Sequence, residues 1–260
     1  MSLTLYVGTP AYGWELVFAI AYAVLGWFCA GCSLRCARLL RPLTRETAGR
    51  CAAKSPEDAA FIALCGGVRH WLRPRSMVVG KRLHWLVPAT AALSCFCAFV
   101  LANRIGVTPV CALLALAVVV LLALAIIDAR SGLLPDVLTL PLLWLGLALA
   151  WAGGGVTLHD AVAGVMVGYG FLYGLFYVFR IVRGREGMGH GDFKLVAAVG
   201  AWVGPLALAQ ALLVACVLAV LYAIGCTRAA GFSSSYPFGP FVAAGAIVVL
   251  TGLPGLHLGL

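Results

Sequence analysis

The sequence predicts an all-α integral membrane protein, a polytopic bundle of about eight transmembrane helices. Its 260 residues are 63% hydrophobic and only 10% charged, whereas a soluble domain carries about a quarter charged residues. The apolar runs are continuous and lack strand-like alternation, and in lipid only helices or closed barrels satisfy their backbone hydrogen bonds. Most of the chain is therefore expected to form helices that face lipid.

Seven apolar windows supply these helices. A span needs roughly 20 mostly apolar residues, and six windows fit one span each: residues 14–34, 85–103, 107–127, 137–153, 161–179 and 237–253. The remaining window, 195–224, is longer than one span needs and is interrupted by Gly200, Gly204 and Pro205. We expect it to form two short helices folded back on each other, which gives eight spans, with seven as the alternative.

The positive charges predict the orientation of the bundle. Eleven of the eighteen Lys and Arg residues lie in one loop, residues 35–84, and the positive-inside rule makes that loop cytoplasmic. With eight spans, every other Lys or Arg except Arg104 falls on the same side; with seven, Arg228 also moves outside. Residues 1–34 contain no Lys or Arg, so we expect no cleavable signal peptide and an N-terminus outside.

The partners expected from this charge pattern are lipids. The net charge is +9, but it is concentrated at one predicted membrane surface, where anionic headgroups attract each Lys or Arg by about 1 kcal/mol. We expect contacts with membrane lipid and none with nucleic acid.

The cysteines do not predict a metal centre. The one metal-like spacing is Cys29, Cys32 and Cys36, which fall on one face of a helix but supply only three thiols. Cys51 as a fourth ligand matches no established zinc spacing. We expect these side chains to pack as small hydrophobic residues.

Two of the nine acidic residues stand out by position. An Asp at the centre of a span costs roughly 2.5–3.5 kcal/mol on insertion scales, so an acid near the membrane is a functional candidate. Asp128 directly follows the span 107–127, and Asp192 opens the apolar segment 195–224. The predicted topology brings both to the cytoplasmic interface, although 64 residues separate them.

A pair of carboxyl groups at one depth is suited to acid–base chemistry. Like charges at close range do not both ionise, so one group keeps its proton while the other acts as a base. The base would activate a water and the acid would polarise a carbonyl, as in an aspartic protease. Gly187, Gly189 and Gly191 precede Asp192 and allow an extended peptide to approach the backbone closely. The alternative is a flexible loop with a helix-capping Asp.

Three motifs in order resemble those of the type IV prepilin peptidases, a family of membrane aspartic proteases with a Gly-x-Gly-Asp motif. The first is Asp128 with the downstream Leu134-Pro135-Asp136, the second is Gly187-Met-Gly-His-Gly-Asp192-Phe-Lys-Leu195, and the third is Pro237-Phe-Gly-Pro240. Their order and spacing match the family across residues 107–253. The resemblance implies that Asp128 and Asp192 are catalytic.

This resemblance implies an activity, a substrate and a location. Family members cleave the short basic leader from type IV prepilins or type II secretion pseudopilins after a Gly, at the cytoplasmic face of the bacterial inner membrane. We accordingly expect an N-terminal membrane region over residues 1–106, with the basic loop 35–84, and an aspartic peptidase membrane domain over 107–260. The peptidase reaction requires no cofactor.

The loop 35–84 departs from the family pattern. Many members carry two Cys-x-x-Cys pairs there that bind zinc, whereas this loop has three cysteines, Cys36, Cys51 and Cys65, and no Cys-x-x-Cys pair, so we expect no zinc. Many relatives also methylate the new N-terminus with S-adenosylmethionine. Since the sequence supplies no glycine-rich strand-to-helix turn for such a cofactor, we expect weak or no methyl transfer, with retained methylation as the alternative.

Other candidate residues have competing interpretations. Asp136 belongs to a family motif, but we interpret it as the N-cap of the span 137–153. Glu186 is a candidate for attracting the basic leader, with a solvated loop acid as the alternative. Lys194 is two residues from Asp192 and does not face it on a helix, so we expect Lys194 to extend toward the membrane surface.

Three other functions compete with that of a prepilin peptidase. A polytopic transporter or channel also uses intramembrane acids, but such folds often contain two related halves, and no repeat is evident here. Signal-peptide-peptidase-like proteases share the Gly-x-Gly-Asp motif but have Tyr before the first Asp, where this chain has Ile127. A catalytically silent assembly subunit would not need both Asp128 and Asp192.

Overall fold

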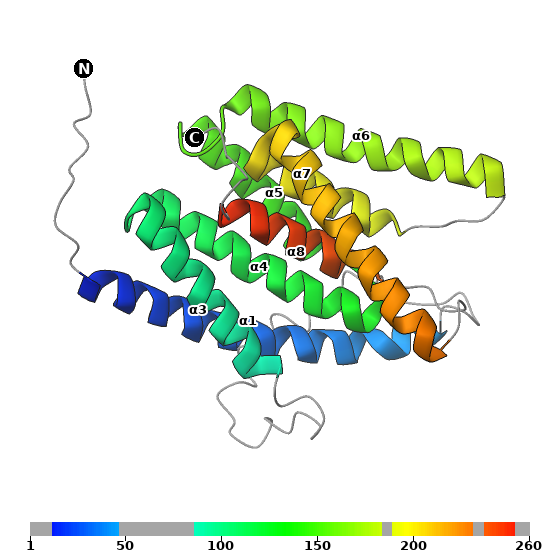
Figure 1. Cartoon of the computed structure of the whole chain (residues 1–260), viewed down its shortest axis with the longest axis horizontal. Helices are drawn as coiled ribbons and strands as arrows, with labels where there is room; N and C mark the ends of the chain where they lie inside the picture. The colour runs from blue at the N-terminus through cyan, green and yellow to red at the C-terminus, as the bar shows by residue number, and fades with distance from the viewer. Residues whose placement is uncertain (1–11, 47–85, 184–188, 231–236, 253–260) are drawn as a thin grey trace.

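The computed structural model describes residues 12–46, 86–183, 189–230 and 237–252. Within these ranges the chain forms seven helices and no strand (Figure 1), which confirms the predicted polytopic helical fold. The helices are α1 (Tyr12–Glu46), α3 (Leu86–Ile105), α4 (Pro109–Ser131), α5 (Asp136–Trp151), α6 (Leu158–Arg183), α7 (His190–Ala230) and α8 (Gly239–Leu250). Five of them are long and apolar enough to cross a membrane, and α5 and α8 are apolar but shorter.

Helix α4 lies at the centre of the bundle. It contacts α1 and α3 on one side and α5 and α8 on the other. Its start is fixed by Thr108, whose side chain accepts a hydrogen bond from the Cys111 backbone N–H, and by Pro109 in the first turn. Its end is fixed by Gly132, which adopts φ 65° and donates its N–H to the Asp128 carbonyl. The helix therefore ends within one turn of Asp128.

Helix α7 turns back on itself in the middle. Gly204 has φ 74° and ψ 176°, a conformation that is essentially restricted to glycine, and Pro205 disfavours helix in the residue before it. The two halves then run side by side, because a Cβ placed on Gly168 of α6 would lie 3.1 Å from the Val196 carbonyl oxygen and 2.9 Å from Leu208 Cδ2. Val196 and Leu208, which lie on opposite sides of Gly204 in the chain, thus both lie against Gly168.

This reversal is visible in Figure 1, where α7 changes direction between its yellow and orange parts. The interpretation of residues 195–224 as two helices folded back on each other is confirmed. Counting the two halves of α7 separately gives eight helical segments in the described part of the chain.

Small residues allow α6 and the first half of α7 to approach closely. A Cβ on Gly164 would lie 2.9 Å from the Gly200 carbonyl carbon and 3.1 Å from that of Gly204, and it would also contact the Gly200 oxygen. Such backbone-to-backbone packing is how membrane helices associate where burial of apolar surface from lipid gains little. It places the start of α7, and with it Asp192, against the bundle.

The first helix differs from the prediction in length. We expected the basic loop to begin at residue 35, but α1 continues without a break to Glu46. The segment 35–46 is rich in Leu and Arg, which are good helix formers, so the helix extends beyond the apolar window. Residues 47–85 lie outside the described ranges, and the prediction of a loop there is not tested.

Candidate active site

Asp128 lies in the last turn of α4 and is buried, with 5% of its surface exposed. Its Oδ2 atom accepts a hydrogen bond of 2.9 Å from the Gly239 backbone N–H. Gly239 is the first residue of α8, so its N–H has no partner within its own helix. The start of a helix also favours a negative charge. Helix α8 therefore holds one carboxyl oxygen of Asp128 in a fixed place.

Only glycine fits at position 239. A Cβ there would lie 2.5 Å from Oδ2 and 3.0 Å from Cγ of Asp128, and contacts this short do not occur without movement of one of the groups. The lack of a side chain therefore lets the backbone N–H reach the carboxyl group. The motif Pro237-Phe-Gly-Pro240 is recognisable in the sequence, but nothing local in it indicates the contact with Asp128.

Asp192 lies in the first turn of α7 and is also buried, with 8% of its surface exposed. Its backbone N–H donates to the Gly189 carbonyl oxygen at 3.2 Å. Gly191 brings this turn against the connection between α4 and α5, because a Cβ at Gly191 would lie 2.9 Å from the Cβ of Leu134. Two of the three glycines predicted to matter thus shape the start of α7.

The structure brings Asp128 and Asp192 together. Their carboxyl groups lie close enough for their charges to interact, although the residues come from the end of α4 and the start of α7. Their chain neighbours Ile127 and Phe193 are fully buried. Burying two carboxyl groups in apolar surroundings is costly, so a pair of this kind points to chemistry rather than to stability.

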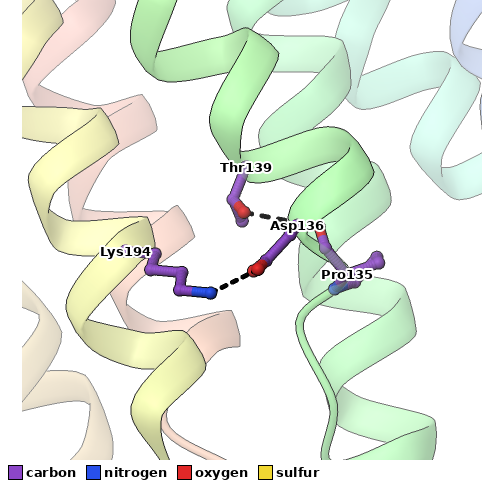
Figure 2. A network of polar contacts seen from close by, with 4 residues as sticks. All are labelled: Pro135, Asp136, Thr139 and Lys194. Atoms are coloured by element: carbon purple, nitrogen blue, oxygen red, sulfur yellow. Dashed lines mark hydrogen bonds and ion pairs between the residues drawn. The ribbon is translucent and has the colours of Figure 1, made fainter. Parts of the chain in front are cut away.

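Asp136 does not cap its helix as we expected. The N-cap of α5 is Pro135, which offers no side-chain hydrogen bond, and Asp136 is the first helical residue. Its carboxyl group instead forms an ion pair with Lys194 of α7 (Figure 2). This ion pair was not predicted from the sequence, and the extension of Lys194 toward the membrane surface stays a prediction.

Two predicted site residues cannot be placed. Glu186 and Gly187 lie outside the described residues. Cys51 also lies outside them, and the side chain of Cys36 is not described, so the structure does not test the set of thiols considered above. Across the side chains that are described, no group of three or more His, Cys, Asp and Glu residues could hold a metal ion.

Comparison with known proteins bears on what this pair of acids does. The model of the type IV leader peptidase family matches residues 115–224, which include both Asp128 and Asp192. The chain belongs to the type IV leader peptidase family. Relatives within it are named prepilin leader peptidase/N-methyltransferase.

Three relatives illustrate the similarity to leader peptidases. The protein from Aeromonas salmonicida is 49% identical over 136 residues, which cover 51% of this chain and 47% of the relative. The protein from Dickeya chrysanthemi is 41% identical over 191 residues, covering 71% and 66% respectively. The protein from Burkholderia pseudomallei is 40% identical over 193 residues, covering 74% and 60%.

The similarity to these leader peptidases does not extend over their full length. The chain spans about half the length of the Aeromonas relatives that it matches. No solved structure matches the chain.

Proposed function

We propose that this protein is a membrane aspartic endopeptidase with Asp128 and Asp192 as its catalytic pair. The observation that carries the proposal is that two buried carboxyl groups, one in the last turn of α4 and one in the first turn of α7, lie close enough for their charges to interact. One carboxylate removes a proton from a water molecule, which attacks the carbonyl carbon of the peptide bond. The other carboxyl group protonates the carbonyl oxygen. The intermediate then breaks the C–N bond as the leaving amine gains a proton.

The substrates that we propose are type IV prepilins or type II secretion pseudopilins. The names of the relatives support this substrate class, as does membership of the leader peptidase family. The leader that is removed is basic and precedes an apolar helix. The peptide bond to be cut lies near the junction between this leader and the apolar helix. When the apolar helix is in the bilayer, that junction lies near the membrane surface, where we propose that Asp128 and Asp192 also lie.

We further propose that the pair faces the cytoplasm from the bacterial inner membrane. Asp128 contacts the first residue of α8, whereas Arg104 approaches Gly252, just beyond the other end of α8. Since α8 has 12 residues, these two points are about 18 Å apart. This separation agrees with a topology in which Arg104 alone lies outside.

Thiol labelling in intact cells tests this orientation. In a chain without native cysteines, a cysteine placed within residues 35–84 should react with a membrane-permeant reagent and resist an impermeant one. A cysteine placed within residues 153–159 should react with both. The reverse pattern would put Asp128 and Asp192 on the outer face and contradict the proposed access of cytoplasmic prepilins.

The product of the reaction in cells should be a cleaved and largely unmethylated pilin. The relatives are named N-methyltransferases as well as peptidases, but residues 35–84 of this chain contain three cysteines and no Cys-x-x-Cys pair, where metal-binding members have two such pairs. A structural zinc site contributes to the folding of the segment that holds it. Mass spectrometry of a co-expressed prepilin reports the new N-terminus and any added methyl group together.

Each result of that measurement has a separate meaning. A cut after the Gly before the apolar segment, without added methyl, is expected. Stoichiometric methylation would show that four cysteines are dispensable for methyl transfer, so that this chain also binds S-adenosylmethionine. An intact prepilin would contradict the proposed peptidase activity.

A further inference from the structure

A charged pair beside the two buried acids has no role in the reaction proposed above. Lys194 Nζ of α7 donates to Asp136 Oδ2 of α5, and Figure 2 shows the two side chains pointing toward each other across the gap between the helices. Thr139, one turn further along α5, donates its hydroxyl hydrogen to the Pro135 carbonyl oxygen at 3.4 Å.

The acid of the pair lies where its own helix favours it. An acid in the first turn of a helix is stabilised by the helix dipole, and Asp136 is the first residue of α5. Lys194 is the fifth residue of α7. The pair therefore joins the start of α5 to the second turn of α7.

The pair links the two segments that carry the acids. Lys194 is two residues after Asp192, so it shares a helical turn with Asp192 but points to a different side. Asp136 begins the helix that follows Asp128 after the short connection 132–135. The contact between Gly191 and Leu134 lies between the same two segments. The start of α7 is therefore attached to the α4–α5 connection at two points.

Stability alone does not account for this pair. The Lys194 side chain is 38% exposed and that of Asp136 is 19% exposed, and partly exposed ion pairs contribute little to folding. Catalysis is far more sensitive to geometry, since a displacement of about 1 Å can lower a rate by about 100-fold. An ion pair that adds little to stability can therefore have a large effect on the alignment of two carboxyl groups.

We propose that Lys194 and Asp136 are positioning residues that hold Asp192 against Asp128 in the geometry for catalysis. The inference rests on the proposed peptidase function, and neither residue exchanges protons with the substrate. Removing either partner leaves the start of α7 with only one of its two attachments to the α4–α5 connection. The acids are then misaligned, while binding of the apolar part of the prepilin is unchanged.

The test is a double-mutant cycle on purified full-length protein in detergent, with one prepilin as substrate. Lys194→Met and Asp136→Asn should each lower kcat by about 10- to 100-fold, with KM within about twofold of wild type. The double variant should be no slower than the slower single variant, because both changes break one contact. Lys194→Arg should recover most of kcat, since it keeps the charge.

Asp160→Asn is the matched control. Asp160 is also an acid in the first turn of a helix and accepts a hydrogen bond from Thr157 Oγ1 at 2.7 Å, but it lies at the start of α6 near Gly204, at the opposite end of the first half of α7 from Asp192. Replacing the Asp160 carboxylate by an amide should leave kcat unchanged. All variants should unfold within a few degrees of wild type, which separates misalignment from loss of fold.

The outcomes distinguish this inference from the proposed function. If wild-type protein cleaves the prepilin and both single variants keep full kcat, the positioning role is wrong and the proposed function is unaffected. Losses that multiply in the double variant, or a raised KM with unchanged kcat, overturn it as well. Wild-type protein that cuts no prepilin overturns the proposed function together with the inference.

Discussion

Asp128→Asn and Asp192→Asn should each lower the rate of leader cleavage by at least about 1,000-fold while leaving the protein folded in the membrane. Asn has nearly the shape of Asp, and at position 128 the Asn side-chain oxygen can still accept the hydrogen bond from Gly239. It can neither take a proton from water nor give one to the carbonyl oxygen. The expected loss is therefore chemical, and kcat measured in detergent reports it directly.

The double variant Asp128→Asn/Asp192→Asn should be no slower than either single variant. Groups that act as a unit show grossly non-additive losses, because removing one already disables the other. Thermal unfolding and membrane yield serve as checks on folding. Near-normal cleavage by either single variant, or losses that multiply, would contradict a shared site.

Gly239→Ala should be the most damaging single change outside the two acids. The added methyl group would lie 2.5 Å from Oδ2 and 3.0 Å from Cγ of Asp128, so either the carboxyl group or the start of α8 must move. The hydrogen bond from the Gly239 N–H would then lengthen or break. We expect kcat to fall about 100-fold, as measured with the same prepilin in detergent.

Gly174→Ala is the matched control for that change. Gly174 lies within α6, and no heavy atom of its surroundings comes within 4 Å of a Cβ placed there. Alanine is favoured over glycine inside helices by about 1 kcal/mol, so this variant should be at least as stable as wild type and equally active. A Gly239→Ala protein with unchanged kcat would show that α8 does not hold Asp128 in the working enzyme.

The sequence predicted the helices where apolar length decides them. Long uncharged runs marked the cores of α3, α4 and α6, and the adjacent Gly204 and Pro205 marked the turn within α7. Helix ends were less predictable, because an apolar window locates lipid contact and not the last hydrogen-bonded residue. This is why α1 continues to Glu46, twelve residues beyond its window.

The site was predictable only in part. Asp128 and Asp192 stood out because an acid beside an apolar run is costly. The hydrogen bond from Gly239 joins residues 111 apart in the chain, and the ion pair between Asp136 and Lys194 joins residues 58 apart. No local pattern encodes such pairs. Because α5 starts one residue earlier than expected, Asp136 is its first helical residue and not its N-cap, and the Asp136 carboxyl group contacts α7 instead.

The most direct test of the account is the mass of the products formed from one prepilin by purified protein. Wild-type protein should release two products whose masses add up to that of the prepilin plus one water, with the cut after the Gly that precedes the apolar segment. The Asp128→Asn/Asp192→Asn protein should leave the prepilin intact. Wild-type protein that leaves every prepilin uncut, or a double variant that yields the same two products, would contradict the assignment of Asp128 and Asp192 as a catalytic pair.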